Sequence, residues 1–229
     1  MDVSDIVQKV TTIGYAVCDR FEPQLSTEEV ALRLGSIMDV SSILPNVPKV
    51  QTLRPRQPTL QLMNQYSGTY GTQEFPWHTD LAHWYLPPRY LMLRCKVGTK
   101  NVATNLISYS NISSAIGERS LKQALVVPRR KRKEQILCPL PVIFSCDEQW
   151  GIRWDFLFLS PLNESAKNIY ETLASHYWHG DEIVSATLLE PGDTIIIDNW
   201  KMLHSRSAVP DESIHREIER IYLNKLGVL

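Results

Sequence analysis

The segment FPWHTDLAHW, residues 75–84, contains a histidine and a carboxylate, His78 and Asp80, separated by one residue. On an extended backbone such positions point to the same side, so the imidazole and the carboxylate can reach one ion. A third candidate ligand, His204, follows the apolar run TIIID much further along the chain. Two histidines and one carboxylate form the facial triad of non-haem Fe(II) sites. Alone, the H-x-D tripeptide is weak evidence for a metal site, and the more common explanation is a solvated turn in which Asp80 accepts from a backbone N–H.

The elements that must position these residues begin with a short mixed region. An amphipathic stretch after Ser4 predicts a helix, and GYAVC from Gly14 alternates like a strand. A second helix is predicted with Ser26 or Thr27 as its N-cap, and its apolar spacing continues to Ile37. The chain is therefore expected to open with a helix, a strand and a helix.

From about Val50 the sequence changes to short β-prone runs separated by Pro, Gly and Asn, among them YLMLRCKV, TNLISYS, DFLFL and TIIID. Many short strands with turn signals predict a sandwich or barrel. The turn EPGD, residues 190–193, is expected to join EIVSATLL and TIIID as a hairpin. One helix interrupts this region, with Asn163 as its N-cap.

Composition argues against several classes of partner. The formal net charge is −1, so no overall field would draw the protein to nucleic acid or anionic lipid, and a small-molecule pocket is expected instead. The four cysteines form no C-x-x-C pair, the first residues lack a signal-peptide pattern, and no apolar run reaches the length of a membrane span. These features predict a reduced, cytoplasmic protein with no membrane partner.

Four segments, in order, resemble the iron(II)- and 2-oxoglutarate-dependent dioxygenases of the taurine dioxygenase and clavaminate synthase-like superfamily, from about Gln51 to the C-terminus. GTYGTQEFPWHTDLAHWYLPPRYLMLRC resembles the H-x-D segment, and PGDTIIIDNWKMLHSRSA resembles the distal histidine segment. These matches imply that His78, Asp80 and His204 are iron ligands. GTKNVATNLISYS and the Arg-x-x-x-Arg of HREIERIYLNK imply that Thr104 and Arg216 hold the carboxylate of 2-oxoglutarate.

The resemblance also implies a fold and an activity. The expected fold is mainly β with flanking helices, a distorted double-stranded β-helix or jelly roll, in one domain over residues 1–229. Residues 1–49 are expected to pack on the barrel, and about 110–150 to form a variable insert near the active-site entrance. With Fe(II), 2-oxoglutarate and O2, the implied reaction hydroxylates a C–H bond of a small polar metabolite and releases succinate and CO2. Desaturation, epoxidation and cyclisation remain open, whereas the carboxylate of Asp80 makes halogenation unexpected.

The residue types in the arginine motif suit a dicarboxylate. Arginine offers a permanently charged, bidentate donor, which lysine does not. Arg216 is therefore expected to bind the distal carboxylate of 2-oxoglutarate. Arg220, four residues further, shares its face on a strand and in related enzymes often meets an anionic group of the substrate. The alternative is a surface strand with alternating charges.

The candidate substrate-contacting residues follow the H-x-D pair or lie in QWGIRWDFLFLSP. His83 and Trp84 are expected near the mouth of the site, although Trp84 is as consistent with an aromatic core contact. Arg153 and Asp155 are expected to share a face and to meet the carboxylate and amine of a zwitterion. A salt bridge between neighbouring strands explains them equally well.

The sequence leaves two alternative functions open. The basic run PRRKRKE, residues 128–134, is either a solvated loop or a surface for an acidic or carrier-bound partner, so a non-enzymatic jelly-roll module that uses residues 129–133 is one alternative. Nucleic acid is not the expected partner, because the aromatic interleaving of an RNA-binding platform is missing. A zinc hydrolase is the other alternative, disfavoured because no general-base glutamate adjoins the ligands.

Overall fold

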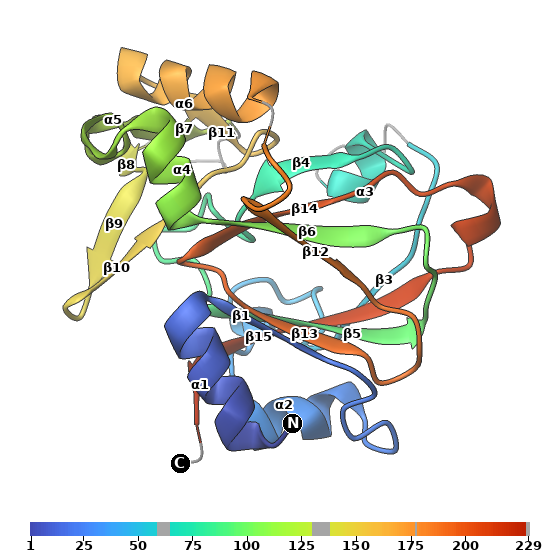
Figure 1. The fold of residues 1–229 in the computed structure, drawn as a ribbon. Coiled ribbons are helices and arrows are strands. Elements are labelled where there is room, and N and C mark those ends of the chain that lie inside the picture. The colour runs from blue at the N-terminus through green and yellow to red at the C-terminus, as the bar shows by residue number, and fades with distance from the viewer. Residues whose placement is uncertain (59–64, 130–137, 177, 228–229) are drawn as a thin grey trace.

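The computed structural model describes residues 1–58, 65–129, 138–176 and 178–227. Its framework is a six-stranded and a four-stranded antiparallel sheet that face each other (Figure 1). The six-stranded sheet has the order β1 (Tyr15–Cys18), β13 (Thr194–Asp198), β5 (Tyr90–Val97), β15 (Glu217–Leu226) and β2 (Gly35–Ile37), with β3 (Gln51–Leu53) also paired to β15. The four-stranded sheet has the order β12 (Ile183–Thr187), β6 (Ala103–Ser108), β14 (Met202–Arg206) and β4 (Phe75–His78).

Two N-terminal helices cover the outer face of the six-stranded sheet. They are α1 (Val3–Ile13) and α2 (Thr27–Leu34). Their apolar residues, among them Ile6 and Val30, pack with Met92, Ile196 and Ile221 of the sheet. The helix, strand and helix expected at the start of the chain are therefore present, and they pack against β-structure.

The ends of these helices correct two details. Helix α1 begins before Ser4, because Asp2 is its N-cap and forms a capping box with Asp5. Helix α2 begins after Ser26, as predicted, but it does not continue to Ile37. It ends at Gly35, which enters β2 so close to β15 that a Cβ atom there would lie 1.9 Å from the carbonyl oxygen of Lys225. Sheet pairing overrides the helical spacing at this point.

The EPGD turn does not form the expected hairpin. Strand β12 pairs with β6 in the four-stranded sheet, whereas β13 pairs with β1 and β5 in the six-stranded sheet. The turn therefore carries the chain from one sheet to the other. The carboxylate of Asp193 holds it by accepting the N–H groups of Leu189 and Glu190.

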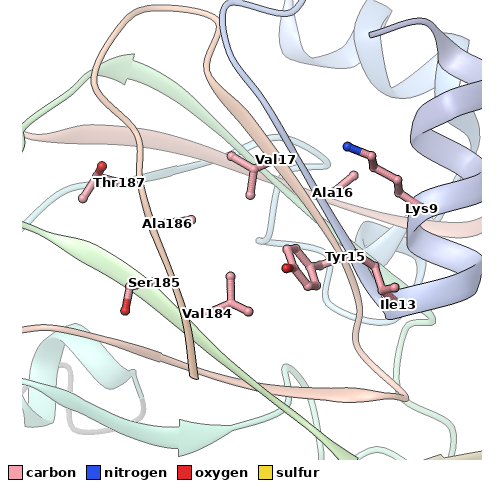
Figure 2. Close-up of a pocket in the computed structure, with 9 residues that line it drawn as sticks. All are labelled: Lys9, Ile13, Tyr15, Ala16, Val17, Val184, Ser185, Ala186 and Thr187. Carbon is pink, nitrogen blue, oxygen red and sulfur yellow. The ribbon is translucent and has the colours of Figure 1, made fainter. Parts of the chain in front are cut away.

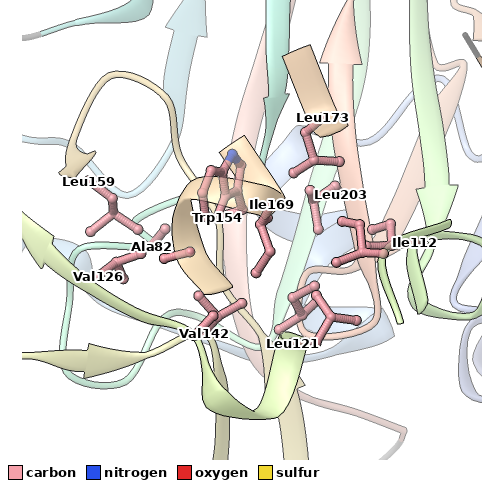
Figure 3. Packing of buried hydrophobic residues seen from close by; sticks show 14 of the residues in the cluster. Ala82, Ile112, Leu121, Val126, Val142, Trp154, Leu159, Ile169, Leu173 and Leu203 are labelled. Atoms are coloured by element: carbon pink, nitrogen blue, oxygen red, sulfur yellow. The ribbon is translucent and has the colours of Figure 1, made fainter. Parts of the chain in front are cut away.

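A second group of helices and short strands packs outside the four-stranded sheet. It comprises α4 (Tyr109–Ile116), α5 (Glu118–Gln123), β7 (Leu125–Pro128), β8 (Leu140–Pro141), β9 (Ile143–Cys146), β10 (Gln149–Ile152), β11 (Leu159–Pro161) and α6 (Glu164–Ser175). Figure 3 shows their core, in which Leu121, Trp154 and Ile169 pack with Leu203 of β14. Asn163 caps α6 by accepting the N–H of Ala166, as predicted.

The run DFLFL, predicted as a strand, is mostly a turn. Asp155 accepts the N–H groups of Leu157 and Phe158, which bends the chain, and β11 begins only at Leu159. Within the described ranges, the remaining elements are α3 (Tyr66–Thr69) and the 3-10 turns Val40–Ser42 and Asp211–Ser213. The expectation of a mainly β fold with flanking helices is confirmed. Among the helices described, none combines the length and apolar character needed to cross a bilayer.

Candidate metal site and ligand cavity

His78 and His204 lie side by side on neighbouring strands. His78 ends β4, and the register of β4 with β14 places it directly opposite His204. The ring centroids are 4.2 Å apart. The Nδ1 of His78 lies 2.8 Å from the carbonyl oxygen of Pro76, which can only accept, so Nδ1 carries the proton and Nε2 is left with its lone pair. The sheet register thus brings together two histidines that are far apart in sequence.

Asp80 completes a group of three potential ligands. Its Oδ1 lies 3.7 Å from Nε2 of His78 and 3.6 Å from Nε2 of His204. One ligand atom from each residue lies within 4.8 Å of the others, and all three side chains are buried. The carboxylate of Asp80 does not cap a turn in the described part of the chain. Its Oδ2 accepts hydrogen bonds from the side chains of Arg220 at 3.1 Å and Tyr222 at 3.0 Å.

The backbone around Asp80 is fixed from two directions. The N–H of Thr79 donates to the carbonyl of Trp154 at 2.8 Å. Asn199, just after β13, accepts from the N–H of Asp80 at 2.8 Å and donates to its carbonyl at 3.1 Å. Leu81 then adopts a left-handed conformation with φ of 56°, which turns the chain away from the site. These bonds hold the carboxylate in place before any ligand binds.

The electrostatics favour a divalent cation. Burial, reinforced by the neighbouring His204, lowers the pKa of His78 to about 3, so its ring is neutral at pH 7. Burial acts to raise the pKa of Asp80, but Arg220, His204 and His78 together outweigh it and hold that pKa well below its usual range. Neutral imidazole and an ionised carboxylate are the forms that bind metal. This set of donors fits Fe(II).

A cavity of ≈ 850 Å³ lies between the two sheets and contains these ligands. Its size is within the range of small-molecule sites. Of the other residues predicted for the site, Thr104, Arg216, Arg220, Asp155 and His83 also line it. The structure therefore gathers most of the predicted residues, drawn from both sheets, around a single space.

Arg216 is a buried cation without a counter-ion among the residues that the structure describes. It precedes β15 and is 7% exposed, and within the described residues its side chain forms no hydrogen bond, with Nε buried and unpartnered. Burial lowers the pKa of its guanidinium to about 10, which still leaves it charged at pH 7. A buried charge and unmade hydrogen bonds are unfavourable unless a ligand supplies the missing acceptor. Such an arrangement suits an anionic group in the cavity.

Arg220 differs from Arg216 because it is already engaged. Its Nη1 donates to Asp80, and its Nη2 donates to Oε1 of Gln51 at 2.6 Å. Thr104 lies in β6, is buried, and stands opposite Arg206 of β14 in the sheet register. Neither Gln51 nor Tyr222 was predicted. A usable signal existed for Tyr222, since it lies two residues after Arg220 and shares its face on a strand.

Asp155 is a buried carboxyl group at the cavity wall. Its Oδ1 accepts two backbone N–H groups, those of Leu157 and Phe158, both at 2.7 Å. The buried Tyr66 hydroxyl lies beside this carboxylate without good hydrogen-bond geometry. Burial raises the pKa of Asp155 to about 7. The carboxyl group is thus poised between its two protonation states near neutral pH, and a nearby cation would favour the ionised form.

Two predicted substrate contacts are not found in the cavity wall. Arg153 donates to the carbonyls of Ala82, Trp84 and Tyr85 and stacks on Phe144, so it does not share a face with Asp155 as predicted. Its role is to hold the segment that follows Asp80. Trp84 packs against the core between the sheets and is not among the residues lining the cavity. The core contact, which was the alternative for Trp84, is what the structure shows.

Another groove, ≈ 440 Å³, opens between the edge strands β1 and β12 (Figure 2). Lys9, Tyr15 and Val17 form one side of it, and Val184 and Thr187 form the other. None of the predicted site residues lines this groove. The chemistry suggested by the sequence therefore belongs to the larger cavity.

The fold and the site together define a β-sheet protein with a two-histidine, one-carboxylate centre. The family model of the taurine catabolism dioxygenase TauD, TfdA family, matches residues 156–222. The matched segment includes His204, Arg216 and Arg220, and it begins after His78 and Asp80.

Solved structures of iron oxygenases share the fold over nearly the whole chain. Asparagine oxygenase in complex with Fe(II), 3-hydroxyasparagine and succinate has a TM-score of 0.67 at 16% identity, covering 97% of this chain and 78% of its own. The non-haem iron oxygenase OrfP, in complex with Fe, succinate and (3S)-hydroxy-L-Arg, has a TM-score of 0.65 at 18% identity. That match covers 96% of this chain and 79% of OrfP. PvcB, an Fe, alpha-ketoglutarate dependent oxygenase from an isonitrile synthetic pathway, has a TM-score of 0.66 at 13% sequence identity. That match covers 97% of this chain and 80% of PvcB.

These findings confirm the resemblance to the taurine dioxygenase-like superfamily. At such identities the solved structures show the fold, and the function has to be argued from the site.

Proposed function

We propose that this protein is an Fe(II)- and 2-oxoglutarate-dependent oxygenase that hydroxylates a C–H bond of a small polar metabolite, an amino acid or a natural-product intermediate. One observation carries the proposal. The ligand atoms of His78, Asp80 and His204 converge in a cavity that also holds the guanidinium of Arg216, which has no hydrogen-bond partner within the described part of the chain. A metal ion bound by the three ligands, with a dicarboxylate that chelates the metal at one end and meets Arg216 at the other, would account for both the ligand set and the buried arginine.

In this proposal Nε2 of His78, Nε2 of His204 and Oδ1 of Asp80 hold Fe(II). When bound, the iron supplies O2 chemistry coupled to the conversion of 2-oxoglutarate to succinate and CO2, and a three-residue triad leaves positions for both co-substrates. The protein's part is to keep the imidazole of His78 neutral and the carboxylate of Asp80 ionised, and burial with the hydrogen bonds described above supports both states. Hydroxylation is the proposed outcome, and halogenation is disfavoured because Asp80 occupies the third ligand position.

Arg216 and Thr104 are proposed to bind the distal carboxylate of 2-oxoglutarate. The guanidinium can donate two parallel hydrogen bonds to a carboxylate, and the threonine hydroxyl can add a third. Support comes from the burial of both side chains at the wall of the same cavity. Because Arg216 has no acidic partner within the described residues, a bound carboxylate would remove the cost of its isolated charge.

The substrate is proposed to be an amino compound that meets Asp155. A carboxylate whose pKa is raised to about 7 by burial gains most from an ammonium group, which restores its ionised form. His83 is proposed as a neighbouring contact, since it lines the same cavity. Arg220 would contact an anionic group of the substrate only by giving up a bond to Asp80 or Gln51. Substrates of two proteins that share this fold, asparagine oxygenase and OrfP, are consistent with an amino acid.

The finer architecture is also proposed. The two facing sheets suit a distorted double-stranded β-helix in one domain over residues 1–229, with about 110–150 as an insert near the entrance. A cytoplasmic location is proposed on the sequence features alone. The possible acidic or carrier-bound partner of residues 129–133 concerns a segment that, apart from Arg129, lies outside the described residues.

The test is a screen for succinate release with the Fe(II)-loaded protein, 2-oxoglutarate and a panel of amino acids and small acids. The expected result is one substrate class that accelerates succinate release and gives a product heavier by one oxygen atom. An Asp155→Ala variant should lose acceleration by amino compounds. Succinate release that no compound in the panel accelerates would contradict the proposed substrate class, and turnover under nitrogen would favour a hydrolase.

A further inference from the structure

The two oxygens of Asp80 have different surroundings. Oδ1 faces Nε2 of His78 and of His204 at 3.7 and 3.6 Å. Oδ2 accepts two hydrogen bonds, from Nη1 of Arg220 at 3.1 Å and from the hydroxyl of Tyr222 at 3.0 Å. Both donors project from β15, which crosses the cavity floor in the opposite sheet from the histidine strands. One strand therefore determines how the carboxylate is oriented toward the histidines.

We propose that Tyr222 and Arg220 act as a clamp that makes Asp80 a single-oxygen metal ligand and keeps the remaining coordination positions open. This inference rests on the proposed Fe(II) site and assigns Tyr222 a positioning role. A free carboxylate can bind a metal through one oxygen or both. With Oδ2 held by two donors, the second mode requires the loss of both hydrogen bonds. The position that Oδ2 would occupy then remains available to the co-substrates.

The position of Tyr222 is explained by its hydroxyl and not by its ring. Tyr222 is 2% exposed and packs among Leu91, Ile197 and Ile218, where phenylalanine would give the same apolar contact. Burying a hydroxyl is unfavourable unless it is hydrogen-bonded. Within the described residues, Asp80 Oδ2 is the acceptor that this hydroxyl has. A tyrosine at this point of β15 is thus accounted for by Asp80.

The clamp extends one residue further from the metal. Gln51 stands opposite Arg220 in the register of β3 with β15, and its Oε1 accepts from Nη2 at 2.6 Å. This bond orients the guanidinium so that Nη1 faces Asp80. Second partners of this kind tune ligand geometry, and their removal typically lowers metal affinity by roughly 10- to 100-fold.

The experiment measures metal binding without turnover. The metal-free protein is titrated anaerobically with Mn(II), followed by the EPR signal of the free ion, and separately with Co(II), followed by its visible absorption. Tyr222→Phe is expected to bind Mn(II) roughly 10-fold or more weakly than the wild type. Its Co(II) band should shift, because a released Oδ2 changes the ligand field. Tyr15→Phe removes a hydroxyl from the groove between β1 and β12 and should leave both readouts unchanged.

A second variant tests the arginine half of the clamp. Gln51→Ala removes the acceptor of Nη2 in a half-buried strand, and we expect a smaller loss of Mn(II) affinity, about 3-fold, with a Co(II) shift in the same direction. Near-ultraviolet circular dichroism establishes that each variant is folded, and if Tyr222→Phe is not, Gln51→Ala decides alone. Wild-type affinity and an unshifted Co(II) band in the folded variants would overturn the clamp. A wild type that binds neither metal would instead overturn the proposed function.

Discussion

Arg94 and Arg216 are both buried arginines, but they lie on opposite faces of the six-stranded sheet and have different surroundings. Arg94 of β5 points to the N-terminal layer and donates five hydrogen bonds, to the carbonyls of Phe21, Glu22, Leu25 and Gly192 and to the hydroxyl of Thr194. Arg216 points into the cavity, and within the described residues its side chain donates none. Burial of a charged side chain alone therefore does not mark a binding site, whereas burial without hydrogen-bond partners does.

The largest expected effect is on stability, and it is expected for replacement of Arg94 but not of Arg216. Arg94→Met removes the donor for five acceptors on the sheet face that faces α2, and we expect the free energy of unfolding to fall by about 4 kcal/mol. Urea denaturation followed by circular dichroism measures this loss. The folded fraction should still bind 2-oxoglutarate within about 3-fold of wild type. A loss below about 1 kcal/mol would contradict the structural role given to Arg94.

Arg216→Met should have the opposite pattern. Replacing an unpaired buried charge by an apolar side chain of similar length is expected to leave the ligand-free protein as stable as wild type or more stable. Affinity of the metal-loaded protein for 2-oxoglutarate should fall by about 100-fold, as expected when a buried ion pair loses one partner. Calorimetric titration measures the affinity, and denaturation measures the stability. If Arg216→Met is destabilised yet binds 2-oxoglutarate normally, Arg216 has a structural role and not the ligand-binding role assigned to it.

Asp155 extends the comparison to a buried carboxylate, through the pH dependence of stability. In the unfolded chain the pKa of its carboxyl group is near 3.8, whereas burial raises the pKa in the folded state to about 7. Between these values the unfolded state binds fewer protons, so stability falls as pH rises from about 4 to 7 and stays low above 7. Asp155→Asn removes this loss while its amide oxygen still accepts from Leu157 and Phe158.

We therefore expect Asp155→Asn to match wild type at pH 4 and to be more stable at pH 8 by about 2 kcal/mol. The difference between 3.8 and about 7 allows at most about 4 kcal/mol. Denaturant unfolding at the two pH values gives the comparison, with Asp181→Asn as an exposed control. Equal changes in stability at both pH values would show that burial does not raise the pKa of Asp155.

The smallest effect concerns Thr104. Thr104→Val keeps the shape of the side chain and removes one hydroxyl, so affinity for 2-oxoglutarate should fall by about 5-fold, corresponding to one net hydrogen bond of about 1 kcal/mol. Thr187→Val, on the neighbouring strand and outside the cavity, is the matched control. If the two variants bind equally well, Thr104 has no part in binding the carboxylate.

Much of the site could be predicted because its residues belong to short motifs. The H-x-D pair needs only a local extended backbone, and the distal His204 needs only a strand that returns beside it. Arg216 could be predicted as a cation. The sequence does not show, however, that Arg216 has no hydrogen-bond partner among the described residues, whereas Arg220 has two. That distinction depends on Gln51, Asp80 and Tyr222 meeting across two sheets.

The errors have a common physical cause, which is tertiary contact overriding local pattern. Gly35 carries a helical spacing, yet pairing with β15 ends the helix there. The EPGD turn has hairpin composition, but its two strands find their partners in different sheets. Arg153 and Asp155 share the spacing of one strand face, although the turn at Asp155 and the carbonyls of Ala82 and Trp84 separate them.

The central claim is that His78, Asp80 and His204 hold a metal to which 2-oxoglutarate binds with its far end on Arg216. The most direct measurement is anaerobic addition of Fe(II) and 2-oxoglutarate to the purified protein, followed by visible absorption. We predict a weak metal-to-ligand charge-transfer band in the wild type, retained in His215→Ala, which alters an exposed histidine, and lost in His204→Ala. A folded wild-type protein that shows no such band, or a His204→Ala variant that keeps it, would contradict the account.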